Sequence, residues 1–109
     1  MYQDKVVLCG SSAYSKKYYL NEDFSGLPET VKNELKIMCV LYTEEIGGIL
    51  TLVYEEDGKL EFEVTSEEGD LLFDEIGSVL KIKQLRREKR ELLEALELYF
   101  KVFFLGEEL

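Results

Sequence analysis

The stretch ILTLVYEEDGKLEFEVT, residues 49–65, decides the fold because it predicts a β-hairpin and fixes its register. A two-residue loop would place Tyr54 opposite Glu61, an apolar side chain against a charged one. A three-residue loop, with Gly58 in a left-handed bulge, places Tyr54 opposite Leu60 and keeps the apolar residues on one face. We favour the second register, which adds two further apolar pairs, Leu52 with Phe62 and Leu50 with Val64.

Two strands and a helix are expected before this hairpin. The β-branched run Lys5–Cys9 and the aromatic segment Tyr14–Leu20 favour strands, joined through Gly10–Ala13. Pro28 is expected to open a helix, because proline at the first helical position costs no hydrogen bond. Apolar residues follow it at helical spacing, and a Gly-Gly pair is expected to end it. The segment Ile37–Tyr42 is apolar nearly all round, so we expect it to be deeply buried.

Residues 69–105 are expected to form one long C-terminal helix. Helical spacing follows the capping-box pattern Thr65–Glu68, and no proline interrupts it. Such a helix is roughly 54 Å long, whereas a domain of this size has a radius of gyration of about 13 Å. The helix must therefore bend near Gly77 or pack on another chain. As an alternative, the aromatic segment Tyr99–Leu105 fits a final strand.

The second half of this helix predicts a homodimer. Its apolar residues follow a heptad spacing, with Lys89 at the one polar position of the seam. The segment 98–105 holds four aromatic residues, which would form an aggregation-prone patch if left in water. The alternative is a break at Gly77 and a tail that folds back on its own core. The dimer interface expected from the seam is Leu85, Leu92, Leu96, Tyr99 and Phe103.

These elements define the expected fold class. The order β-β-α-β-β-α predicts a single two-layer α+β domain over residues 1–109, with no repeat or linker that would divide it. We expect an antiparallel sheet with helices on one face and a long C-terminal helix. The sequence leaves the order of the strands in the sheet open.

The composition removes most catalytic chemistry. None of the 109 residues is a histidine, so the chain has no Ser-His-Asp triad and no imidazole metal ligand. Cys9 stands at a strand end before small residues, where nucleophiles occur, but a free cysteine is more often a buried small hydrophobe. Cys39 falls on the apolar helix face and is expected in the core. The acidic clusters lack the spacing of a calcium loop, and no glycine-rich turn carries a P-loop lysine. We therefore expect no enzymatic activity, no cofactor and no metal site.

The charge of the chain is uneven. With 13 basic and 23 acidic side chains, the net charge is -10, which argues against DNA binding. Residues 81–90 nevertheless hold six basic side chains and one acidic one. On a helix, four of the basic residues share one face, which is either solvated, or bound to an acidic protein, to RNA or to the acidic surface of a second copy. This expected partner patch is Lys83, Arg86, Arg87 and Arg90.

The sequence also predicts a location. No charged and apolar leader is recognisable at residues 1–5, and the longest apolar runs are far shorter than the roughly 20 residues that cross a bilayer. We therefore expect a cytoplasmic protein with reduced thiols and no membrane contact.

Four motifs carry a resemblance to a known family. They are VLCGSSAY at residues 7–14, KYYLN at 17–21, FSGLPE at 24–29 and FDEIG at 73–77. These segments resemble those of a family of small acidic proteins from anaerobic Firmicutes, a family of unknown function. The resemblance spans nearly the whole chain and implies a bacterial cytosolic protein, but it implies no activity and no site.

Two functions from different classes remain open. The first is a non-enzymatic, homodimeric protein-interaction module that binds an unidentified partner through a helix or sheet-edge surface. The alternative is a small-ligand or regulatory binding domain, with a pocket between sheet and helices gated by Tyr14, Tyr18 and Tyr19.

Overall fold

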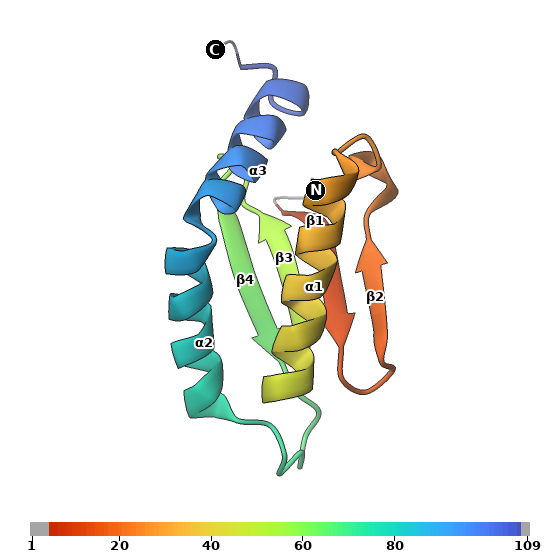
Figure 1. Ribbon diagram of the computed structural model, residues 1–109, viewed down its shortest axis with the longest axis vertical. Helices are drawn as coiled ribbons and strands as arrows, with labels where there is room; N and C mark the ends of the chain where they lie inside the picture. The colour runs from red at the N-terminus through yellow and green to blue at the C-terminus, as the bar shows by residue number, and fades with distance from the viewer. Residues whose placement is uncertain (1–4, 108–109) are drawn as a thin grey trace.

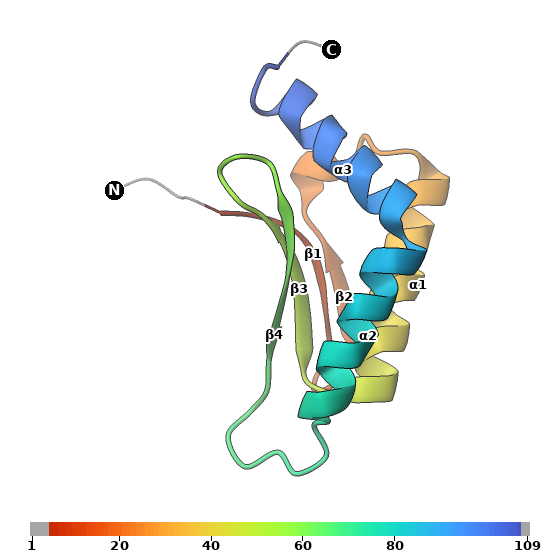
Figure 2. The ribbon, with the colours of Figure 1, turned by 90° about the vertical axis from the view of Figure 1, so that its left-hand side faces the viewer.

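The computed structural model describes residues 5–107 and shows an α+β fold in two layers. A four-stranded antiparallel sheet forms one layer, and all three helices cover the same face of it (Figures 1 and 2). The expected fold class is confirmed. The strands are β1 (Val6–Ser12), β2 (Lys17–Leu20), β3 (Ile49–Tyr54) and β4 (Leu60–Thr65). The three helices are α1 (Glu29–Ile46), α2 (Glu75–Glu88) and α3 (Arg90–Phe103), and a short 3-10 turn, η1 (Glu22–Phe24), precedes α1.

The sheet consists of two hairpins placed side by side, in the order β2-β1-β3-β4. The predicted register of the second hairpin is confirmed, with Tyr54 opposite Leu60. Gly58 has φ +93°, as the left-handed bulge requires. A Cβ atom at Gly58 would lie 2.9 Å from Cγ of Lys101, so this turn also provides the surface on which the end of α3 packs.

The first hairpin differs from the prediction in where its turn lies. The segment Gly10–Ser12 continues β1 instead of ending it, and the turn is formed by residues 13–16. The physical reason is the close approach of β1 to β3. A Cβ at Gly10 would lie 3.0 Å from the carbonyl oxygen of Leu50, so the glycine permits the contact between strands.

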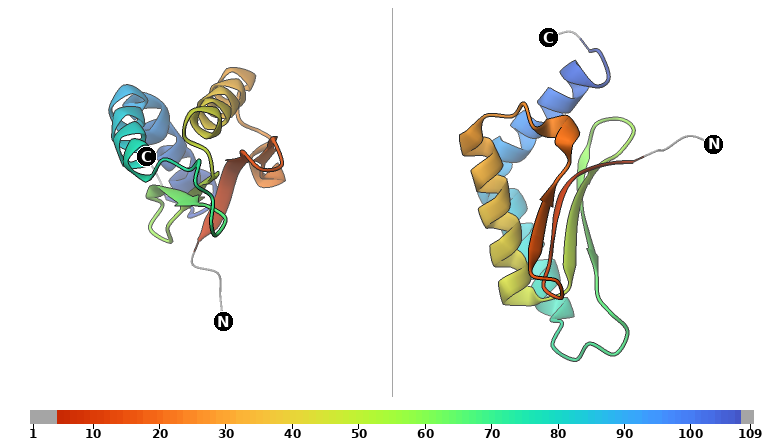
Figure 3. Two further views of the ribbon diagram at one scale, coloured as in Figure 1. Left: turned by 90° about the horizontal axis from the view of Figure 1, so that it is seen from below. Right: turned by 90° about the vertical axis from the view of Figure 1, so that its right-hand side faces the viewer.

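Helix α1 lies on the sheet and places one face in the core. Pro28 is its N-cap residue, one position before the first helical residue, and Gly47 ends it with φ +90°. The expectation that the segment 37–42 is deeply buried is wrong for Ile37 and Leu41, which are more than half exposed. Each is two residues from a buried residue of α1, Leu35 or Cys39, and so lies on the opposite side of the helix. Figure 3 shows that the outer side of α1 is not covered by another of the described elements.

The C-terminal helical segment begins later and bends elsewhere than predicted. Residues 66–74 form a loop, and Asp74 caps α2 by accepting a hydrogen bond from the amide of Gly77 at 2.8 Å. Gly77 therefore lies in the first turn of α2, where no bend occurs. The break falls at Lys89, with φ -106° and ψ 23°, so the long segment consists of α2 and α3. The segment from Tyr99 to Phe103 is helical, so the alternative of a final strand is wrong.

The break at Lys89 lets α3 complete the chain's own core. The ring of Phe100 stacks on Tyr54 of β3 at 4.2 Å between centroids, and Phe24 stacks on Phe104 at 4.7 Å. The Tyr54 hydroxyl donates a 2.9 Å hydrogen bond to the carbonyl oxygen of Leu96. The tail therefore folds onto the chain that carries it, and its aromatic residues fill the end of the two-layer core.

Candidate functional site

Five large apolar side chains lie exposed at one end of the helical layer, and none of them is needed to build the core. Leu71 is 95% exposed, Leu72 is 90% exposed and Ile76 is 76% exposed. Clusters of exposed apolar side chains on soluble proteins mark surfaces that bind another molecule. We call this cluster the α2 face, and it consists of Leu71, Leu72, Ile76, Val79 and Leu80.

The α2 face is exposed because α2 packs on the rest of the chain through other residues. Only Ser78 and Leu85 of this helix are buried. The small Ser78 side chain brings α2 against α1, where its hydroxyl hydrogen-bonds the hydroxyl of Tyr42. Ile76 and Leu80 lie on the opposite side of the helix, since they are separated by a full turn and each is two residues from Ser78.

The loop at residues 66–74 holds its part of the α2 face in place. The Tyr14 hydroxyl donates a hydrogen bond to the carboxylate of Asp70 and accepts one from the amide of Glu67. The Asp70 bond lowers the pKa of Asp70 below its ordinary value and raises that of Tyr14, because it favours the ionised carboxylate and the protonated phenol. The amide of Asp74 also donates to the carbonyl of Ile46. These contacts fix the path of the loop on either side of Leu71 and Leu72.

Opposite charges flank the α2 face along the helix. Toward the C-terminus, Lys83, Arg87 and Arg90 of the expected partner patch are exposed. Arg86 is engaged within the chain, 3.6 Å from a carboxylate oxygen of Glu61 and 5.0 Å above the ring of Phe62. Toward the N-terminus, a hollow of about 640 Å³ is bordered by five carboxylates, those of Glu67, Glu68, Asp70, Asp74 and Glu75.

The residues expected to form a dimer seam on the C-terminal helix do not share one exposed surface. Leu85 and Leu96 are buried in the chain's own core, and Leu92 and Tyr99 pack against that core. Phe103 is the exposed member, at 70%. The heptad spacing that suggested the seam is interrupted at Lys89, which turns α3 toward the sheet.

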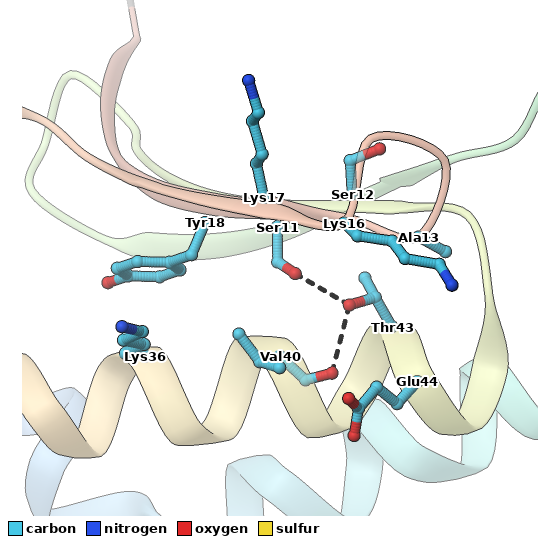
Figure 4. Close-up of a pocket in the computed structure, with 10 residues that line it drawn as sticks. All are labelled: Ser11, Ser12, Ala13, Lys16, Lys17, Tyr18, Lys36, Val40, Thr43 and Glu44. Carbon is cyan, nitrogen blue, oxygen red and sulfur yellow. Dashed lines mark hydrogen bonds between the residues drawn. The ribbon is translucent and has the colours of Figure 1, made fainter.

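A second concave site lies between the first hairpin and α1, on the other side of α1 from α2 (Figures 1 and 4). We call it the hairpin cleft. Its volume is about 610 Å³, and Tyr18 is the one member of the expected tyrosine gate that lines it. Tyr14 instead holds the 66–74 loop, and Tyr19 lies on the open face of the sheet. The cleft is lined by Ser11, Ser12, Ala13, Lys16, Lys17, Tyr18, Lys36, Val40, Thr43 and Glu44.

The two cysteines meet beneath this cleft. The sulfurs of Cys9 on β1 and Cys39 on α1 are 3.9 Å apart, and both side chains are fully buried. The contact with Cys9 and burial raise the pKa of Cys39 far above its ordinary value. A protonated, buried thiol is a poor nucleophile, so this geometry favours a packing role for the pair.

Other kinds of site are not found in the part of the chain that the structure describes. Within residues 5–107, acidic and cysteine side chains nowhere gather in a group of three that could bind a metal ion. The helices of the same residues are each too short or too polar to cross a membrane.

The fold and its surfaces define a small α+β protein with helices on one face of an open sheet and an exposed apolar helix face. The chain belongs to DUF6145, a family of unknown function, whose model matches residues 5–108. Neither the curated proteins nor the solved structures give a significant match. The family membership agrees with the resemblance to an uncharacterised family that the sequence motifs suggested.

What the sequence missed is the exposure of the residues on the α2 face. Leu72, Ile76, Val79 and Leu80 are recognisable as an apolar helical stripe. A stripe of this kind is normally buried. The signal that distinguishes this one is the charge of the residues on either side of it in the sequence. Charges of opposite sign bracket the stripe in the sequence, with acidic residues at 67–75 and basic residues at 81–90.

Proposed function

We propose that this protein is a non-enzymatic interaction module that forms a homodimer through the α2 face. One observation carries the proposal, which is the exposure of Leu71, Leu72 and Ile76 in a segment held by defined hydrogen bonds. Burying a leucine or isoleucine side chain contributes about 1.5–3 kcal/mol. In a dimer the same side chains are buried on both chains, so this free energy is gained twice and favours association.

Charge complementarity supports a second copy as the occupant of the face. In a two-fold symmetric interface, every contact of one chain is repeated by the other. If two α2 helices pair antiparallel about an axis near Leu80, the apolar halves meet. Arg87 lies seven residues from Leu80, about 10 Å along the helix. It then lies opposite the turn of the partner that carries Asp74 and Glu75, at the border of the acidic hollow.

The same arrangement explains a basic band in an acidic chain. Lys83 and Arg87 form no ion pair with the residues that the structure describes, whereas Arg86 does. Across the dimer, their charges would oppose the carboxylates of the other chain and fix the register of the helices. The patch then recognises a protein surface. A net charge of -10 disfavours DNA as a partner.

We place this module in the bacterial cytoplasm. The two thiols are free at a sulfur separation of 3.9 Å, which fits a reducing compartment. The bacterial source follows from the resemblance of the sequence motifs.

Sedimentation equilibrium tests the dimer. The wild-type chain is expected to show twice its chain mass of 12.7 kDa at tens of micromolar. Ile76→Glu and Leu80→Glu are expected to return the mass to that of one chain, because each places two carboxylates near the symmetry axis. Circular dichroism checks that the variants keep their helix content.

Phe103→Glu is the matched control, because Phe103 is nearly as exposed as Ile76 but lies on α3. This variant is expected to remain a dimer. A wild-type mass equal to one chain would overturn the proposal. A dimer that dissociates with Phe103→Glu and survives Ile76→Glu would also overturn it, because association would then use the α3 surface.

A further inference from the structure

The hairpin cleft has the dimensions and the lining of a small-molecule site. Its volume of about 610 Å³ falls within the range of ligand pockets. Apolar surface comes from Ala13, Val40 and the ring of Tyr18, and polar groups come from the strand and the helix on either side. The cleft lies on the opposite side of α1 from α2, so what it binds does not depend on the α2 face.

The cleft gathers positive charge in a strongly acidic protein. Lys16, Lys17 and Lys36 line it, against the single carboxylate of Glu44. Figure 4 shows that Lys17 points away from α1, whereas Lys36 extends from α1 toward Tyr18 and Lys16 reaches over the other end. In the region covered by residues 5–107, Lys16 and Lys36 make no ion pair. Two unpaired ammonium groups therefore flank one cleft, one at each end.

Lys16 closes the turn of the first hairpin, where its amide donates a 2.9 Å hydrogen bond to the carbonyl of Ser12. Lys16 has φ 56° and is the single non-glycine residue at positive φ within residues 5–107. The left-handed conformation is unfavourable for a residue with a Cβ atom, and glycine or asparagine is the usual choice there. A left-handed residue is common in short hairpin loops, so the turn accounts for this conformation. A lysine at this position places its ammonium group over the cleft.

The floor of the cleft is able to accept hydrogen bonds. The Thr43 hydroxyl donates to the carbonyl of Val40 at 3.1 Å, so the 2.7 Å bond between Ser11 and Thr43 is donated by Ser11. Both hydroxyl protons are thereby used within the protein, and lone pairs on the oxygens remain. A ligand hydroxyl could donate to them, whereas a carboxylate placed there would find no donor. The acidic groups of a ligand therefore belong at the lysine ends.

We propose that the hairpin cleft binds a small organic dianion of the dicarboxylate class. One carboxylate interacts with Lys36 and the other with Lys16, and the chain between them lies over Val40 and Thr43. A hydroxyl on that chain adds a hydrogen bond to the floor. Large polyanions are disfavoured because the rest of the surface is acidic.

Amide chemical-shift titration of the full chain with malate, succinate and acetate, at constant ionic strength, tests this site. Malate and succinate are expected to shift the amides of Ser11, Lys16 and Val40, with malate the tighter ligand. Acetate carries one carboxylate and is expected to bind about tenfold more weakly than succinate. The same shifts with acetate at equal affinity would overturn the proposal that the two lysines each bind one carboxylate.

Variants separate binding from folding. Lys36→Gln and Lys16→Gly are each expected to weaken succinate binding about tenfold, whereas Lys59→Gln, an exposed lysine in the other hairpin, leaves it unchanged. Lys16→Gly also relieves the left-handed strain, so its melting temperature without ligand is expected to equal or exceed that of the wild type. Unchanged binding in both cleft variants, or no shift with any dicarboxylate at millimolar concentration, would overturn the proposal.

Discussion

Helices α2 and α3 have the same length and follow one another in the chain, but they use their apolar residues in opposite ways. Helix α3 buries Leu93, Leu96 and Phe100 against the sheet and the aromatic cluster. Helix α2 buries Leu85 and leaves Ile76, like its neighbours on the α2 face, in solvent. Apolar residues in α3 therefore hold the fold together, and those on the α2 face are available to another molecule.

Alanine substitutions on the two helices are expected to give the largest contrast. In a Leu80→Glu background, which keeps the chain monomeric, Phe100→Ala should lower the free energy of unfolding by about 3–5 kcal/mol, because it leaves a cavity between Tyr54 and Phe104. Ile76→Ala in the same background should change it by less than about 0.5 kcal/mol. Urea denaturation measures both values. Equal losses would show that the two helices do not differ in their contribution to the fold.

Charge reversal should have a smaller effect, confined to association. Arg87→Glu is expected to weaken dimerisation about tenfold, since it places like charges across the interface. The association constant of the wild-type dimer should fall as salt is added, because salt screens the attraction between opposite charges. The association constant of the variant should depend on salt less, or in the opposite sense. Sedimentation at two salt concentrations measures this. A dimer constant that Arg87→Glu leaves unchanged would contradict the proposed register.

The smallest expected effect concerns the loop that holds Leu71 and Leu72. The folded-state pKa of Asp70 is lowered, so its contribution to loop stability is present above the unfolded pKa of about 4 and is lost as the pH falls through the folded value. Tyr14→Phe removes the main cause and should raise the pKa of Asp70 toward its ordinary value. Carboxyl NMR titration measures the shift. An unchanged pKa would show that the Tyr14 hydroxyl does not hold the loop.

The contrast between the helices also explains what could be predicted from the sequence. The register of the second hairpin was predictable, because the side-chain period of two and the Gly58 turn leave one register with a continuous apolar face. The end of α1 at Gly47 was predictable for a similar local reason. At these two places a local rule leaves one outcome, and the structure follows it.

The helix break was not predictable, because two local signals competed. Gly77 looked like the weak point, but the carboxylate of Asp74 caps its amide and fixes the first turn of α2. Lys89 carries no local signal for a break. Helix α2 ends at Lys89 because a turn there brings the aromatic residues of α3 to the sheet, where Phe100 stacks on Tyr54. Such a tertiary preference is not visible in helical spacing.

The candidate sites were predicted in part. Lys83, Arg87 and Arg90 of the basic band are exposed, and their role as a partner patch stays a prediction. The sequence shows the apolar stripe beside them but gives no sign that its side chains are exposed. The alternative of a pocket between sheet and helices names Tyr18, which lines the hairpin cleft, but not its lysines. Lys16 and Lys36 are 20 residues apart in the sequence and come to one cleft through the packing of the first hairpin on α1. Neither residue belongs to a motif, so only the fold brings them together.

The distance between two copies of α2 tests the central claim most directly. A spin label is attached to the cysteine of Leu80→Cys, while Cys9 and Cys39 are buried and do not react. Pulsed electron paramagnetic resonance then measures the distance between the labels on the two chains. Because packed helices lie about 8–10 Å apart, the account predicts a label separation of less than about 25 Å. It also predicts a longer separation for labels at Phe103→Cys. A short distance at position 103 and a long or absent one at position 80 would contradict it.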